Sequence, residues 1–212
     1  MFVKDWMTKN VITVFPDTKI DTAAYIMLSK NIKHLPVVNS EKELLGIVVK
    51  SDIRGVMPES TIDKKEDLSD KKPLFVKDIM SDEVVSINEN DTLEDALLFI
   101  YQGRIGALPV VDDENRVVGI ISRYDILKAM VAIMGLEEPG SRVDVVLEDR
   151  PGMLELLAKE FKELDINIIS VIVSNTGDKK RIVSIRFDGL FKHKVEEHLK
   201  SKGFKIYYPW KA

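Results

Sequence analysis

The sequence predicts an α+β protein in which two β-α-β-β-α units form a pseudo-symmetric pair and a ferredoxin-like β-α-β-β-α-β unit follows them. Three observations predict this fold class. A pattern recurs at constant spacing in the first two thirds of the chain, and both copies carry strand and helix signals in the same order. A stretch rich in Gly, Pro and Ser then precedes a different pattern.

The repeat is defined by three anchors in the sequence. Each anchor returns 73 positions later: Val3 at Val76, Pro36 at Pro109, and Asp52 at Asp125. Because the offset is the same at all three anchors, we interpret the two segments as one structural unit used twice.

Both copies present the same order of local signals. A short β-branched run, residues 11–14 or 84–87, predicts a strand, and residues 35–38 and 45–49 predict a hairpin around a polar turn. Thr18 and Thr92, each three residues before an aspartate, predict capped helix starts. The helices after them are expected to bury the stripes Ile20, Ala24, Met27 and Leu28, or Leu93, Leu97, Ile100 and Tyr101. A last helix is expected to begin near Asp52 or Asp125.

The last third of the chain reads as a separate unit. A strand over residues 143–147 leads through a turn to an amphipathic helix, with Pro151 expected at its first position. Strands are expected over residues 166–173, 181–187 and 204–208. The predicted domains are therefore residues 1–57, 74–134 and 142–212, with connectors over 58–73 and 135–141.

Composition excludes several classes of protein. The 212 residues are 45% hydrophobic and 31% charged, and no uninterrupted apolar run reaches the length of a membrane span. The amino terminus lacks a secretion signal, so we expect a cytoplasmic protein. The absence of cysteine excludes disulfides and thiolate chemistry. A net charge of -4 with interleaved lysines and acids argues against nucleic-acid binding.

The repeated motif resembles the CBS family. Each copy carries Leu-Pro-Val-Val-Asn/Asp and, some ten residues later, Gly-Ile-x-x-x-x-Asp-Ile, and the resemblance covers residues 1–134. It implies a tandem pair that requires no cofactor and holds an adenosine ligand, AMP, ADP, ATP or S-adenosylmethionine, as effector. The implied contacts are Thr13, Val14, Lys50 and Asp52 in the first copy, and Ser86, Ile87, Pro109, Ser122, Arg123 and Asp125 in the second.

The two half-sites are expected to differ. The family pattern places a hydroxyl three residues before the aspartate, where the second copy has Ser122 and the first copy has Val49. We therefore expect a weaker or empty half-site in the first copy. The alternative interpretation is that Asp52 and Asp125 only cap helices, because Ser122-x-x-Asp125 is also a capping box.

Residues 142–208 resemble the ACT family of amino-acid-sensing modules. The resemblance rests on Asp149-Arg150-Pro151-Gly152 directly after an apolar strand, and on Asp165-Ile166-Asn167-Ile168 at the next strand. It implies that an amino acid contacts Asp149, Arg150, Gly152, Met153, Asn167 and Ile168. The alternatives are an ordinary strand-to-helix turn and a unit that serves only for dimerisation.

The candidate catalytic and metal-binding motifs in the sequence each lack a required residue or spacing. The Gly135-to-Gly140 spacing lacks the Lys-Ser/Thr of a phosphate loop, and His193 and His198 do not share one helix face. We also find no serine with a positioned base. From these observations together we expect neither an enzyme nor a metal site.

The predicted function is allosteric sensing. The composition resembles stand-alone CBS-ACT regulatory proteins, some of the acetoin-utilisation type, and implies a homodimer that regulates an unidentified partner protein. The alternatives are a dimerisation module without ligand, and an enzyme that acts on a bound nucleotide.

Overall fold

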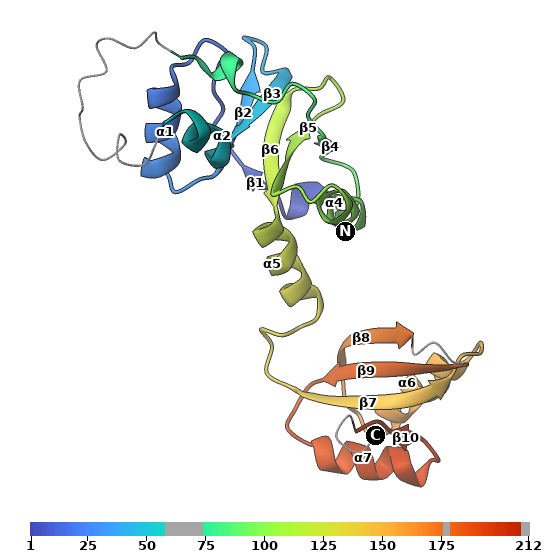
Figure 1. Ribbon diagram of the computed structural model, residues 1–212. Coiled ribbons are helices and arrows are strands. Elements are labelled where there is room, and N and C mark those ends of the chain that lie inside the picture. Colours follow the sequence, from blue (N-terminus) through green and yellow to red (C-terminus); the bar gives the residue numbers. More distant parts are fainter. Residues whose placement is uncertain (58–73, 176–178, 209–212) are drawn as a thin grey trace. The chain divides into compact units, whose positions relative to one another are not determined.

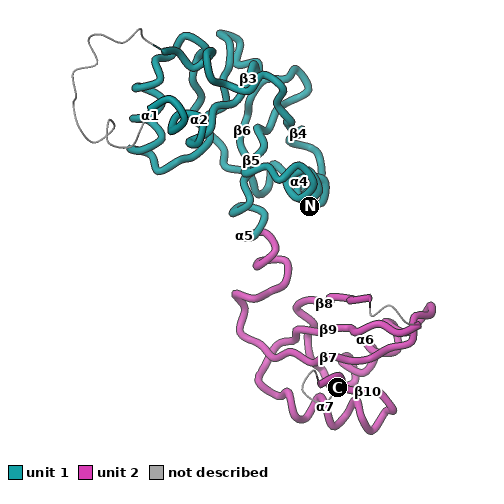
Figure 2. Tube along the Cα trace, in the orientation of Figure 1, with its two compact units in different colours: residues 1–127 teal, residues 128–212 magenta. Residues whose placement is uncertain are grey.

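The computed structural model describes residues 1–57, 74–175 and 179–208. The chain divides into two compact units, residues 1–127 and 128–212 (Figure 2). The boundary between them falls within one helix, a few residues before the domain end expected at residue 134. The predicted connector 58–73 lies outside the described residues.

Except for the short strands β1 and β4, which are not equivalent, two copies of one succession of elements form the first unit, and the last helix of the second copy crosses the unit boundary (Figure 1). The first copy comprises η1 (Val3–Asp5), β1 (Thr8–Lys9), α1 (Ile20–Ser29), β2 (His34–Val38), β3 (Leu44–Val49) and α2 (Lys50–Val56). The second comprises η2 (Val76–Asp78), β4 (Ile87–Asn88), α4 (Leu93–Gln102), β5 (Ala107–Val111), β6 (Val117–Ser122) and α5 (Arg123–Ile133). The predicted strand over residues 11–14 is reduced to one parallel bridge, between Val14 and Val37.

The two hairpins have the same register. Pro36 faces Ile47 in the β2–β3 hairpin, and Pro109 faces Ile120 in the β5–β6 hairpin. Both hairpins also shift register one residue before they end, after Val37 and after Val110. This equivalence extends the sequence repeat to the backbone hydrogen bonds. β6 is further joined to β1, and β5 to β4, in the sheet order β1-β6-β5-β4.

The opening segment of each copy packs on the other copy. The amide of Val76 donates to the carbonyl of Thr18 at 2.9 Å, and the amide of Val3 donates to the carbonyl of Asp91 at 2.9 Å. Val76 is fully buried and belongs to the core cluster of the first copy. The two copies therefore exchange their first residues, and neither core is complete without the other copy.

Two glycines permit the exchanged segments to cross the hairpins. Ser81 pairs with Ile47, and Thr8 pairs with Ile120. A Cβ atom on Gly46 would lie 2.9 Å from the carbonyl oxygen of Ser81, and one on Gly119 would lie 3.0 Å from that of Thr8. The crossing segments thus occupy the space that a side chain would need.

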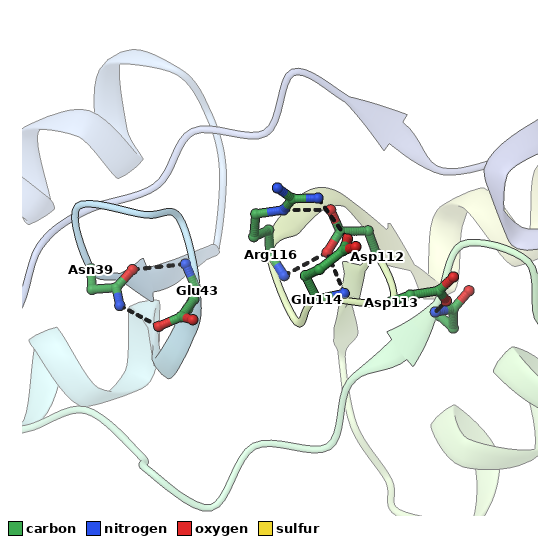
Figure 3. Close-up of polar contacts among 7 residues, drawn as sticks. Asn39, Glu43, Asp112, Asp113, Glu114 and Arg116 are labelled. Atoms are coloured by element: carbon green, nitrogen blue, oxygen red, sulfur yellow. Dashed lines mark hydrogen bonds and ion pairs between the residues drawn. The ribbon is translucent and has the colours of Figure 1, made fainter.

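The two hairpin turns also meet each other. The amide of Leu44 donates to the carbonyl of Asn115, and the amide of Val117 donates to the carbonyl of Lys42. Each turn is closed by its own side chains: Asn39 accepts from the amide of Glu43 at 2.9 Å, and Asp112 accepts from the amide of Arg116 at 2.8 Å (Figure 3). This contact closes one end of the pair.

Two sequence expectations for the repeat helices are wrong. Thr18 does not cap α1, because its hydroxyl accepts from the amide of Phe15, whereas Thr92 does cap α4. The stripes are also narrower than predicted: Ala23 and Ala96 are buried, while Leu28, Leu97 and Tyr101 are exposed. The other members of the predicted stripes are buried as expected: Ile20, Ala24, Met27, Leu93 and Ile100. The small alanines beside them allow each helix to approach its sheet closely.

The second unit has the predicted order β-α-β-β-α-β. It comprises β7 (Ser141–Glu148), α6 (Met153–Glu163), β8 (Ile168–Asn175), β9 (Lys180–Phe187), α7 (Lys192–Ser201) and β10 (Lys205–Ile206). The sheet order is β10-β7-β9-β8, as in ferredoxin-like folds. Phe161, Leu157 and Phe187 centre its core. Part of the predicted turn at 175–178 lies outside the described residues.

Local details of the second unit differ from expectation. Pro151 precedes α6 instead of starting it, because the helix begins at Met153 after Gly152, whose φ is 85°. Residues of the predicted connector 135–141 pack on the sheet, where the carbonyl of Glu138 accepts from Arg186. The adjacent carbonyl of Met134 accepts from the Ser170 hydroxyl at 2.9 Å. Within the described ranges, no helix has the length and apolar character needed to cross a membrane.

The close approach at Gly119 makes a testable prediction about stability. Gly119→Ala is expected to destabilise the protein by about 1 to 3 kcal/mol, because the added methyl group overpacks the β1–β6 crossing. Gly55→Ala in α2 is the matched control: nothing lies within 4 Å of its added Cβ, and the free energy of unfolding is expected to rise by up to about 1 kcal/mol. Urea unfolding measures both, and equal effects would contradict the crossing as a steric constraint.

Candidate functional site

A cavity of about 440 Å³ lies between the two copies of the first unit. The bridge between Ile47 and Ser81 places the start of the second copy beside β3, and the amide of Lys50 donates to the carbonyl of Lys33 at 2.9 Å. Both copies supply walls: Lys33, His34, Ile47, Val49, Lys50 and Ser51 from the first, and Ser81, Glu83, Val84, Val85, Ile105, Gly106, Ala107 and Pro109 from the second.

The lining combines basic and apolar side chains. Lys33, His34 and Lys50 are the basic residues of the lining, and Glu83 supplies its one carboxylate. Valine and isoleucine side chains form much of the remaining wall. A pocket of this size and composition suits a small molecule with an apolar ring and an anionic group.

His34 is partly buried where the two copies meet. Burial lowers the pKa of its imidazole, and the positive charges of Lys33 and Arg123 lower this pKa further, while Asp52 opposes them. A Cβ atom on Gly106 would lie 2.6 Å from the His34 Nε2 atom, so the imidazole lies directly against the backbone of the second copy. The histidine is therefore held largely neutral at pH 7.

The predicted motif at the start of α5 forms a helix cap. The Asp125 Oδ2 atom accepts from the Ser122 hydroxyl at 2.6 Å and from the Ser122 amide at 2.8 Å. Arg123 donates to the carbonyls of Ile105 and Arg104 at 2.8 and 2.7 Å. In the first copy, Asp52 accepts from the Val49 amide at 2.9 Å. Both aspartates therefore make helix-capping contacts, which both interpretations of the motif allow.

The cavity gathers only part of the predicted nucleotide-contact set. Lys50 and Pro109 line it together, although they come from different copies. The other predicted residues lie outside the lining. Thr13 and Ser86 are partly buried, and the residues that follow them, Val14 and Ile87, are in the core. Asp52 follows the lining residues of α2, and Ser122, Arg123 and Asp125 lie at the start of α5.

Sequence reasoning missed several residues of the lining. Lys33, His34 and Glu83 belong to it, yet they lie just outside the recurring motifs. The usable signal for His34 is its position directly before the Leu35-Pro36 anchor. For Glu83 we find none, because its place follows from the exchange of opening segments between the copies.

The second unit carries its own cavity, of about 570 Å³, at the β7–α6 turn. Four predicted residues line it: Asp149, Arg150, Gly152 and Met153. Asn167 and Ile168, at the start of β8, do not line it. Arg181 of β9, which the sequence did not indicate, lines the cavity and pairs with Asp149 at 2.8 Å. Leu147, Val173 and Val183 supply apolar wall.

One cluster of side chains has the composition of a metal site. Ligand atoms of Glu160, Glu163 and His198 lie within 4.8 Å of one another between α6 and α7. His198 contacts Glu160 at 2.8 Å, and the Lys202 ammonium lies 2.8 Å from Glu163 and 3.6 Å from Glu160. The hydrogen bond from Lys202 lowers the pKa of Glu163. Because the Lys202 ammonium contacts both carboxylates, we interpret the cluster as an ion-pair network that joins the two helices.

Comparison with known proteins points to one family. A family model described as the CBS domain matches residues 3–59 and 76–132. Inosine-5'-monophosphate dehydrogenase from Methanocaldococcus jannaschii is 32% identical over 178 residues, which are 84% of this chain and 33% of that protein. The chain therefore spans about a third of the length of this curated relative.

Two solved structures are similar to about two thirds of the chain. CBSX2 from Arabidopsis thaliana, in complex with AMP, has a TM-score of 0.54 at 27% identity and covers 62% of this chain and 97% of its own. An acetoin utilization protein, AcuB, from Vibrio cholerae has a TM-score of 0.54 at 28% identity and covers 65% of this chain and 96% of its own. The similarity to acetoin-utilisation proteins predicted from the sequence is confirmed for the paired repeats.

Proposed function

The chain belongs to the CBS domain family, and from this premise we propose that it is a non-catalytic cytoplasmic sensor that binds an adenosine-containing ligand and regulates a partner protein. The observation that carries the proposal is the cavity between the two copies, with three basic side chains on its wall. The AMP complex of a similar CBS pair supports an adenosine ligand for this chain.

We place the ligand in the cavity beside α2. Lys33 and Lys50 supply positive charge for a phosphate there, and the apolar walls suit an adenine ring. In the second copy, the Asp125 carboxylate is engaged by Ser122, and the Arg123 guanidinium is engaged by backbone carbonyls. We therefore propose the cavity beside α2 as the principal ligand site. The Ser122 motif of the second copy stays a predicted half-site.

The choice between the two half-sites predicts unequal losses from matched substitutions. Lys50→Ala is expected to weaken AMP binding about ten- to a hundredfold, as the loss of a charge-assisted contact does, and more than Arg123→Ala, the substitution at the equivalent position of the second copy. Each variant loses one positive charge at the first residue of its helix. Calorimetric titration measures both. A larger loss from Arg123→Ala would assign the ligand to the second-copy motif, as the sequence predicts.

For the second unit, we propose an ACT-type amino-acid site in the cavity at the β7–α6 turn. Gly152, with φ of 85°, keeps the backbone free of a side chain at the start of α6. Asp149, Arg150 and Arg181 surround that point with both signs of charge, which suits an α-amino and an α-carboxylate group. The ferredoxin-like strand order supports this proposal.

Ligand-induced stabilisation tests the sensor against its alternatives. Nucleotide-free protein is expected to gain thermal stability from at least one of AMP, ADP, ATP and S-adenosylmethionine, by about 2.7 kcal/mol at a hundredfold excess over Kd. The standard amino acids, added separately, test the second unit in the same assay. No stabilisation by any nucleotide would favour a dimerisation module. Chromatographic detection of a converted nucleotide would favour the enzyme alternative.

We propose a homodimer formed through the outer faces of α1 and α4. Both helices expose an apolar pair at equivalent positions: Tyr25 and Leu28 in the first copy, Leu98 and Tyr101 in the second. Tyr25 and Tyr101 are 70% and 78% exposed. The two members of each pair are three residues apart, so they lie on one face of their helix and form an exposed apolar patch. A two-fold dimer would bury both pairs at once.

The dimer is tested by mass in solution. Light scattering at micromolar concentration is expected to give twice the 24.1 kDa of the chain. The double substitution Leu98→Glu with Tyr101→Glu is expected to give the monomer, because it places charge in the buried face. Leu154→Glu, which changes an equally exposed leucine of α6, is the control and should keep the dimer. A wild-type mass of one chain would contradict the dimer, and a dimeric double variant would contradict the surface.

A further inference from the structure

His34 joins the two copies at the wall of the first cavity. It is the first residue of β2, and its ring lies against Gly106 of the second copy. The loop that carries Gly106 is held in place, because Arg123 donates to the carbonyls of Arg104 and Ile105 and its own amide donates to the carbonyl of Gly106. The imidazole thus has a defined position beside the ligand space.

Several charged groups lie around His34. Lys33, Arg123 of α5 and Asp52 of α2 act on its imidazole electrostatically. Lys50 of α2 and Glu83 of the segment before β4 line the same cavity. Burial lowers the pKa of His34, and the net positive charge of Lys33, Arg123 and Asp52 lowers this pKa further. An empty cavity therefore holds a neutral imidazole at and above pH 7.

An anionic ligand reverses this balance. A phosphate placed among Lys33, Lys50 and His34 would offset the two ammonium charges and add an acceptor for an imidazole N–H. An opposite charge within about 4 to 6 Å raises a histidine pKa by roughly one unit or more. The cavity would then favour the imidazolium form that it disfavours when empty.

We propose that His34 takes up a proton when an anionic adenosine ligand enters the cavity, so that binding strengthens as the pH falls. This inference rests on the proposed ligand site and adds its regulation. The sign follows from linkage: a group that is more protonated in the complex than in the free protein makes affinity rise with proton concentration. The dependence falls between the pKa of the free and of the bound protein.

The second copy offers no equivalent group. The 73-residue offset places Ala107 at the position of His34 and Gly106 at the position of Lys33. Proton uptake is therefore a property of the cavity beside α2 alone, and it separates this site from the Ser122 half-site. His193 and His198, the other histidines of the chain, belong to the second unit.

Calorimetric titration with AMP tests the proposal. At pH 7.0 and 8.5 the phosphate is largely doubly charged, so its own titration contributes little. The Kd of the wild type is expected to be about two- to tenfold lower at pH 7.0 than at pH 8.5, for a pKa rise of about one to two units. Titration at pH 7.0 in two buffers of different ionisation enthalpy is expected to show uptake of up to one proton. His34→Gln should lose both effects, and His198→Gln should keep them.

A second measurement keeps the proposal testable where a variant folds poorly. The pKa of His34, followed by nuclear magnetic resonance in the wild-type chain, is expected to rise when AMP is added. Gly106→Ala, whose methyl group displaces the imidazole, should reduce the pH dependence while His34 is still present. AMP binding without proton uptake and with an unchanged His34 pKa would overturn this inference and leave the ligand site intact. No AMP binding at either pH would contradict both.

Discussion

The exchange of opening segments between the two copies is the constraint on which the first unit depends. Val3 and Val76 are each fully buried, and their amides bond to carbonyls of the opposite copy. A buried amide without a partner is costly, so neither copy can release its opening segment without exposing apolar surface and orphaned backbone groups. The two copies therefore fold as one body, with the glycines at 46 and 119 admitting the crossings.

This exchange also produces the cavity. Because the second copy begins beside β3 of the first, residues 81–85 reach the start of α2, and the cavity wall is composite. The duplication gives the two copies the same backbone fold, but the side chains at equivalent positions differ in charge and polarity. His34, Lys33 and Lys50 stand on one side of the pair, and the positions equivalent to the first two are Ala107 and Gly106. A symmetric backbone thus carries asymmetric chemistry.

The second unit depends on its own core and carries a different kind of site. Its cavity has charges already paired, Arg181 with Asp149 and Arg150 with Glu148, around an apolar wall. Residues on both sides of the boundary expected after residue 134 belong to this unit, because the carbonyl of Met134 accepts from Ser170 and that of Glu138 accepts from Arg186. The segment between the repeats and the sheet is therefore part of the folded unit.

The sequence by itself determined the duplication, the order of elements in both units and the hairpins, because these follow from local periodicity and from a repeat with constant offset. It also identified Lys50 and Pro109, which lie in recurring motifs. Only the tertiary structure decided that Val3 and Val76 belong to the opposite copy, that alanines and not Leu28 or Tyr101 face the core, and that His34, Lys33 and Glu83 share a cavity. Those outcomes depend on contacts between residues far apart in the chain, whose geometry no local pattern encodes.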